Sequence, residues 1–250
     1  MKNSLDETKF ILKKYNITAN KRYGQNFLIN DNVIQEISEV AEIEKTDLVI
    51  EIGPGLGTLT SKLLEKAGKV IAIELDDKMI KILNDRFKLY NNFILINDDI
   101  LQVNLKELIG QNEKEFSSVK VVANLPYYIT TPIIMKLLEE RLKIDSITVM
   151  VQKEVADRIT AKPGDKFSGA ITYSVDYYAE AENVIFVSKD CFIPSPEVDS
   201  EVIKLQIRKT PAVKVENEEL FFKVIKASFM QRRKTLINGL INSGIITNKE

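Results

Sequence analysis

Residues 124–128 place an amide, a proline and two aromatic rings directly after an apolar run; they read Asn124-Leu125-Pro126-Tyr127-Tyr128. The Asn side chain can accept a hydrogen bond, the rigid Pro fixes the turn so that neighbouring carbonyl groups point outward, and a Tyr ring gives a flat heterocycle a stacking surface. These properties suit chemistry on a nucleobase. Taken alone, however, five such residues are explained at least as well by a strand-ending turn with a buried Tyr pair.

The composition excludes several kinds of catalysis. With 250 residues, 44% of them hydrophobic and 28% charged, the chain is long enough for one large domain and a small second one. One Cys and no His rule out intrachain disulfides, His-based metal sites and nucleophiles activated by His, so we expect no metal. No apolar run reaches membrane-spanning length and the first residues lack a signal-peptide core, which predicts a cytoplasmic protein without membrane contact.

Basic residues concentrate in two blocks, although the net charge is only −1. The first block lies within residues 9–30, which contain no acid, and comprises Lys9, Lys13, Lys14, Lys21 and Arg22. The second lies within residues 221–240, again without an acid, and comprises Lys223, Lys226, Arg232, Arg233 and Lys234. A run of charge is more often a solvated face, but two separate blocks on a near-neutral chain favour a one-sided surface for a polyanion.

The order of the apolar segments predicts an α/β fold. We expect strands at 48–52, 69–74, 93–96, 119–123 and 144–151, and helices at 9–15, 31–41, 58–67, 76–87 and 131–141. Asp31 is the expected N-cap of the second helix, and Thr131 with Pro132 the expected start of the last. The alternation implies a parallel sheet with helices on both faces. Further on, 169–178 is compatible with a helix or a strand, 181–187 and 198–207 with paired strands, and 220–229 with a helix.

Polar and glycine residues gather after the first four predicted strands, where such sheets bind their ligands. They are Glu51, Gly53, Gly55 and Gly57 after the first, Glu74 after the second, Asp98 and Asp99 after the third, and residues 124–128 after the fourth. Each acid alone is explained equally well as a solvated strand end or a turn cap. Agreement at four strand ends favours a binding site.

The glycine spacing argues against a dinucleotide site. That fingerprint needs a third Gly three residues after the second, where this chain has Thr58 or Thr60, depending on the glycine from which one counts. The spacing of Gly53, Gly55 and Gly57 instead lets the backbone approach a ligand that has no pyrophosphate.

The three acids suit an adenosyl cofactor. Glu51, just before the glycines, is typical of S-adenosylmethionine sites. Glu74 can accept both ribose hydroxyls, and Asp99 can accept from the adenine amine.

Five segments, in order along nearly the whole chain, resemble the ribosomal RNA small-subunit adenine dimethyltransferase family, the kasugamycin-resistance methyltransferases. The segments are Tyr23–Leu28, Glu51–Thr60, Asn124–Tyr127, Phe192–Ser200 and Phe229–Leu236. The related erythromycin-resistance methyltransferases of large-subunit RNA more often have Ile where this chain has Leu125, so they are less similar.

The resemblance implies a Rossmann-like seven-strand S-adenosylmethionine-dependent methyltransferase domain over 1–209, including a basic segment 1–30. A small α-helical domain over 210–250 would follow, apparently truncated, because family members usually continue further. The expected activity is methylation of the N6 amines of two adjacent adenosines near the 3′ end of 16S ribosomal RNA, by a monomer acting on a pre-30S particle.

The resemblance also implies roles for individual residues. The cofactor would be held by Asn26, Leu28, Gly53, Gly55, Glu74, Asp99 and Asn124. The adenine amine would be oriented by Asn124 and the carbonyl of Leu125 or Pro126, and its ring stacked between Tyr127 and Phe192. For Tyr128 we expect a place in the core. RNA contacts are expected at Lys21, Arg22, Arg232, Arg233 and Lys234.

This chemistry needs no His. Acceptors that hold the amine hydrogens out of the ring plane localise the nitrogen lone pair, and the methylated product sheds a proton readily to water, so no tuned general base is required. Two alternatives remain: an erythromycin-resistance-type enzyme, or an RNA-binding assembly factor that keeps the fold without turnover.

Overall fold

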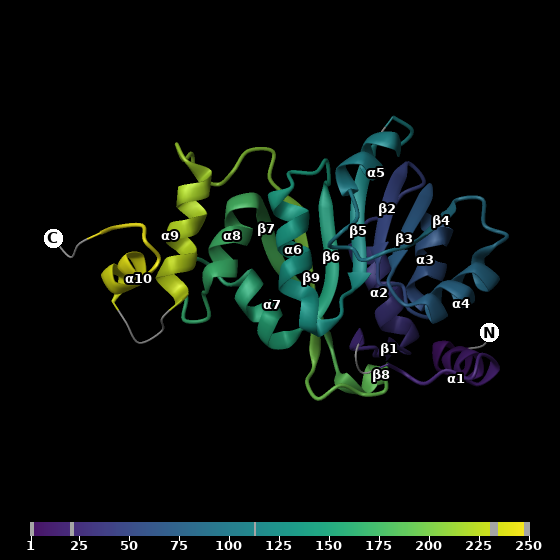
Figure 1. Ribbon diagram of the computed structural model, residues 1–250. Helices are drawn as coiled ribbons and strands as arrows, with labels where there is room; N and C mark the ends of the chain where they lie inside the picture. The colour runs from purple at the N-terminus through teal and green to yellow at the C-terminus, as the bar shows by residue number, and fades with distance from the viewer. Residues whose placement is uncertain (1–2, 21–22, 113, 231–234, 248–250) are drawn as a thin grey trace.

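A seven-stranded sheet lies between two layers of helices in the computed structural model, which describes residues 3–20, 23–112, 114–230 and 235–247 (Figure 1). The strand order is β4-β3-β2-β5-β6-β9-β7. The parallel strands are β2 (Asp47–Ile52), β3 (Lys69–Glu74), β4 (Phe93–Asn97), β5 (Ser118–Asn124) and β6 (Ser146–Gln152). β9 (Ser200–Ile207) pairs antiparallel with β6 and with β7 (Ala179–Val187). The predicted seven-strand α/β fold is confirmed.

Alternation along the strands divides the core into two hydrophobic clusters. In β2, Leu48, Ile50 and Ile52 belong to one cluster and Val49 to the other. The first cluster is completed by α5 (Leu105–Asn112), α6 (Thr130–Glu139), α7 (Lys153–Thr160) and α8 (Ala170–Tyr178). The second is completed by α1 (Ser4–Lys14), α2 (Asp31–Val40), α3 (Thr58–Lys66) and α4 (Asp77–Phe87). The sheet is therefore covered on both faces, which explains why its central strands are mostly apolar; Glu51 of β2 is a buried exception.

Two helix starts differ from the sequence-based expectation. Asn30, not Asp31, caps α2, because its side chain accepts from the backbone N–H groups at 32 and 33; Asp31 instead accepts from Ser4 of α1. α6 begins at Thr130, earlier than expected, because the short 3₁₀ helix η2 (Tyr127–Ile129) leads directly into it.

Helix α9 (Glu218–Met230) packs on α8 at the end of the molecule opposite α1, and α10 (Leu236–Asn242) follows it (Figure 1). The ring of Tyr178 stacks on Phe222 with centroids 5.5 Å apart, and Tyr177 contacts Phe221 at 5.2 Å. Glu218 accepts from the Tyr178 hydroxyl at 2.7 Å and forms a salt bridge with Arg141, which lies just beyond the end of α6. This aromatic contact attaches the C-terminal helices to the sheet domain.

The sequence pattern did not predict α5, α7, α10 or a second, two-stranded sheet. In that sheet β1 (Phe27–Leu28) pairs antiparallel with β8 (Phe192–Ile193), preceded by the 3₁₀ helix η3 (Lys189–Cys191). It fastens the N-terminal loop beneath the carboxyl ends of the parallel strands (Figure 1). Within the described ranges no helix is both long and apolar enough to cross a membrane.

Two glycine substitutions provide a matched test of this packing. Gly57 has φ +81°, and an added Cβ would lie 2.5 Å from the Phe87 ring, so we expect Gly57→Ala to lower the free energy of unfolding by about 2–5 kcal/mol. Gly110 lies in α5 with open space around it, so Gly110→Ala should raise that energy by roughly 0.5–1 kcal/mol. Urea unfolding measures both, and a harmless Gly57→Ala would contradict the packing of α3 on α4.

Candidate active site

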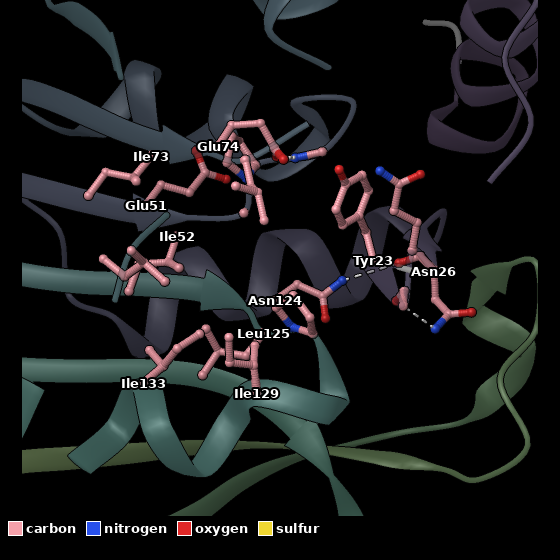
Figure 2. A pocket seen from close by; sticks show the side chains of 18 of the residues that line it. Tyr23, Asn26, Glu51, Ile52, Ile73, Glu74, Asn124, Leu125, Ile129 and Ile133 are labelled. Atoms are coloured by element: carbon pink, nitrogen blue, oxygen red, sulfur yellow. Dashed lines mark hydrogen bonds between the residues drawn. The ribbon is translucent and has the colours of Figure 1, made fainter. Parts of the chain in front are cut away.

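A cavity opens at the carboxyl ends of β2 to β5 and is closed on one side by the N-terminal loop (Figure 2). It gathers most of the residues proposed from the sequence: Asn26, Leu28, Gly53, Gly55, Glu74, Asp99, Asn124, Leu125, Pro126 and Tyr127. These residues come from five separate segments of the chain. The strand-end rule thus locates the cavity.

The turn after β2 leaves the cavity room for a ligand. Gly53 has φ +66°, a conformation that favours glycine, and a Cβ at this position would meet only Pro126, at 3.9 Å. The open space beside Gly53 is consistent with a close approach of a ligand to the backbone.

Glu74 is held by two backbone donors. Its Oε2 accepts from Gly55 N at 3.1 Å and its Oε1 from Asp76 N at 2.9 Å. Burial raises the pKa of Glu74, while these hydrogen bonds act in the opposite direction. Each carboxylate oxygen keeps a second lone pair, so the group is oriented and can still accept from a ligand.

Glu51 is the most deeply buried acid of the cavity, with 1% of its surface exposed. Burial, aided by the nearby charge of Glu74, raises the pKa of Glu51 to about 8. Its Oε2 has no hydrogen-bond partner within the described part of the chain. A buried polar atom without a partner is costly, so this oxygen can accept from a ligand donor or from the nearby Thr60 hydroxyl, which is also buried and lowers the pKa of Glu51.

The Asn124 amide is oriented by the N-terminal loop. Its Nδ2 donates to the Asn26 carbonyl at 3.3 Å, which leaves Oδ1 as an acceptor (Figure 2). The loop is fixed in turn, because Asn26 Nδ2 donates to the Gly24 carbonyl at 3.2 Å and Gln25 donates to Asp76 at 2.8 Å.

The two carbonyl groups proposed beside Asn124 are not equivalent. The Pro126 oxygen accepts from Ile129 N at 3.2 Å and from Thr130 Oγ1 at 3.1 Å, which engages both of its lone pairs. Leu125 donates its N–H to Met150, and no donor to its oxygen is found among the described hydrogen bonds. The structure therefore favours the Leu125 carbonyl as the second acceptor.

Tyr127 is half-buried at the cavity wall. Its hydroxyl lies 2.6 Å from Oγ of Ser200, a fully buried residue at the start of β9. Burial raises the pKa of Tyr127, so it presents a neutral ring whose position is fixed from β9.

The structure places Phe192 and Tyr128 differently from expectation. Phe192 is 3% exposed and packs with Phe27 and Leu28, because the β1–β8 pairing directs its ring into the hydrophobic cluster; it is not among the described residues that line the cavity. Tyr128 does line the cavity and is 58% exposed, so the prediction that it packs in the core was wrong. Successive residues of a 3₁₀ turn diverge by about 120°, so Tyr128 cannot follow Tyr127, whose hydroxyl reaches the buried Ser200.

Two apolar residues of the cavity wall, Leu75 and Ile100, were not predicted from the sequence. Leu75 directly follows Glu74, and Ile100 directly follows Asp99. The sequence feature that could have predicted them is the apolar residue immediately after each strand-end acid. The proposed RNA contacts Lys21, Arg22, Arg232, Arg233 and Lys234 lie outside the described residues.

Comparison with known proteins identifies a family. A family model described as "Ribosomal RNA adenine dimethylase" matches residues 16–249. The "Ribosomal RNA small subunit methyltransferase A" of Bacillus pumilus is 52% identical over 94% of this chain and 81% of its own length. The protein of the same name from Clostridium acetobutylicum is 53% identical over 93% of this chain and 83% of its own length.

Solved structures agree with this match. A dimethyladenosine transferase from Plasmodium falciparum aligns with a TM-score of 0.72 and 31% identity, covering 86% of this chain and 74% of that one. The 23S rRNA methyltransferase ErmE aligns with a TM-score of 0.68 and 27% identity, covering 87% of this chain and 84% of that one. The chain thus belongs to the ribosomal RNA adenine dimethylase family.

Proposed function

We propose that this protein transfers methyl groups from S-adenosyl-L-methionine to the N6 amines of two adjacent adenosines near the 3′ end of small-subunit ribosomal RNA. The observation that carries this proposal is the oriented Asn124 amide beside the Tyr127 ring and the Leu125 carbonyl, to which no described residue donates, at the mouth of a cavity suited to an adenosyl cofactor. Relatives named for the small subunit are 52% and 53% identical, against 27% for ErmE, which favours the small-subunit substrate.

The cavity fits the cofactor. Glu74 offers two oriented acceptors for ribose hydroxyls, and the unpartnered Oε2 of Glu51 suits a donor on the methionine part. Asp99 uses Oδ1 to accept from Leu101 N at 2.9 Å and keeps Oδ2 for a base amine. Leu75 and Ile100 line the same cavity and suit the apolar faces of a base. When bound, S-adenosylmethionine supplies an electrophilic methyl group on a sulfonium ion.

Asn124 and Leu125 activate the adenine amine in this proposal. Its lone pair is delocalised into the ring, so the amine is a weak nucleophile. Acceptance of its two hydrogens by Asn124 Oδ1 and the Leu125 carbonyl holds them out of the ring plane and localises the lone pair. The nitrogen then forms the new N–C bond as the S–C bond breaks, and one amine proton passes to water.

Tyr127 stabilises the adenine once it has left its stack. Stacking on one ring contributes about 1–3 kcal/mol, comparable to the few kcal/mol that extruding a base costs. The bond to Ser200 fixes the Tyr127 ring before the base arrives, so little ordering remains to be done on binding.

The two basic blocks would bind the RNA phosphates. The segment 210–250 would form a separate small domain that enlarges the RNA-binding surface. We place this step of ribosome biogenesis in the cytoplasm, with a monomer acting on a pre-30S particle. A non-catalytic assembly factor on the same fold would have no chemical need for the oriented acceptors at Asn124 and Leu125, which favours the enzyme.

Incubation with methyl-labelled S-adenosylmethionine and immature small subunits, followed by mapping of the modified bases, tests the function directly. Label on adjacent adenosines near the 3′ end of the small-subunit RNA is the expected result. Label confined to large-subunit RNA would select the erythromycin-resistance type of activity, and RNA binding without label would select the assembly factor.

Asn124→Ala removes the side-chain acceptor, and we expect turnover to fall at least ~100-fold while RNA binding stays nearly intact. Methyl incorporation under saturating substrate and a filter-binding assay measure the two effects. Asn91→Ala, which removes an exposed amide before β4, is the control. Undiminished turnover in Asn124→Ala would overturn the mechanism.

Glu51→Gln tests the raised pKa of the buried acid. Because the folded-state pKa of about 8 lies above the ordinary value of 4.5, the stability due to protonated Glu51 is present at low pH and is lost as pH rises toward 8. Relative to the variant, wild type should lose up to ~1.4 kcal/mol per pH unit between these values in urea unfolding without cofactor. Curves that stay parallel, as expected for the exposed control Glu36→Gln, would contradict this account.

Reversing Arg232 and Arg233 to Glu tests the proposed RNA surface. We expect weaker RNA binding, with the slope of log affinity against log salt reduced by about 2 because two phosphate contacts are lost. The matched control reverses Lys81 and Lys88, two exposed lysines outside both blocks. An unaltered slope would exclude these arginines from the phosphate contacts.

A further inference from the structure

Tyr128 is a large aromatic residue exposed at the mouth of the cavity. It directly follows the proposed stacking ring Tyr127, lines the same cavity and is 58% exposed. Its neighbours in sequence are anchored, since Tyr127 bonds to Ser200 and Ile129 N donates to the Pro126 carbonyl. The ring therefore projects from a fixed turn.

The N-terminal loop supports this ring from one side. At Gly24, which has φ +58°, an added Cβ would lie 3.3 Å from Cδ1 and 3.6 Å from Cε1 of Tyr128. The ring thus packs closely on the backbone of Gly24, where a side chain would push it away. A supported ring on a residue that is 58% exposed offers a preformed surface for stacking.

We propose that Tyr128 is a second stacking residue, which holds the base adjacent to the adenosine undergoing methylation. This inference rests on the proposed function. The target base lies on Tyr127 inside the cavity, and its neighbour in the RNA lies on the exposed part of the Tyr128 ring. The two consecutive tyrosines thus receive two consecutive nucleotides.

Stacking suits a substrate with two adjacent target adenosines. When first one and then the other adenosine enters the cavity, the flanking nucleotide at the mouth changes in identity and in methylation state. A contact that reads base edges would favour one register over the other, whereas every base has a π-face, so stacking tolerates both. Tyr128 therefore provides affinity for the RNA strand without selecting between the registers.

A purely structural role for Tyr128 makes different predictions. If the ring only covers Gly24 and steadies the N-terminal loop, its removal will weaken cofactor binding, because Asn26 and Leu28 of that loop line the cofactor cavity. A stacking role instead changes the KM for RNA and leaves cofactor affinity unchanged. The two roles are separable in one set of variants.

The experiment compares Tyr128→Ala and Tyr128→Phe with wild type in the full chain, on immature small subunits. From ~1–3 kcal/mol per stacked base, KM for the particle should rise about 5- to 150-fold in Tyr128→Ala, with kcat within about 2-fold and cofactor Kd unchanged. Tyr128→Phe keeps the stacking ring, so most of this rise in KM should be absent in it. Tyr90→Ala, at an exposed ring outside the described cavity lining, is the matched control.

A second arm keeps the inference falsifiable if Tyr128→Ala loses stability. With particles that carry an abasic residue next to the target adenosine, the KM of wild type should be higher than with intact particles. On these abasic particles the KM of Tyr128→Ala should be nearly the same as that of wild type. An unchanged KM in Tyr128→Ala, independent effects of the two changes, or a parallel loss of cofactor affinity would overturn the inference. Absence of methylation by wild type would instead refute the proposed function.

Discussion

The hydrogen bond from Asn124 Nδ2 to the Asn26 carbonyl joins the catalytic turn to a loop 98 residues earlier in the chain. It leaves Oδ1 of the amide as the atom for the proposed adenine contact, since a reversed amide would present donors where the proposal needs acceptors. The bond requires the loop to lie where it does, and the β1–β8 pairing and the contact from Gln25 to Asp76 keep it there. The chemistry of the site thus depends on the position of a segment outside the main sheet.

Glu74 couples the same loop to the strand ends. Its carboxylate accepts from Gly55 and Asp76, and Asp76 both caps α4 and receives the Gln25 side chain. One buried carboxylate therefore orders the glycine turn, the start of α4 and, through Asp76, the N-terminal loop. The acceptors proposed for the cofactor are thus fixed by the fold itself, which would lower the entropy lost on binding.

Local patterns were sufficient for the sheet and for most of the cavity. The continuous apolar runs of β2 and β3 predicted buried parallel strands, and the acids and glycines at their ends predicted the cavity. The two misplaced aromatic residues of the site are explained by long-range contacts. Phe192 is directed inward by pairing with Leu28, more than 160 residues away in the chain, and Tyr128 is held outward on Gly24 of the N-terminal loop; neither partner is visible in the local sequence.

There is a physical reason why Tyr128 lines the cavity and Phe192 is buried, the reverse of what we expected. For Phe192 to line the cavity, its ring would have to leave the hydrophobic cluster in which β8 packs against β1. That packing holds the N-terminal loop, and the loop orients the Asn124 amide. Tyr128 is exposed without disturbing any of these contacts, because its turn is anchored through Tyr127 and Thr130. The fold thus places one aromatic residue where it secures the loop and the other where it can meet RNA, so packing and recognition do not compete for the same ring.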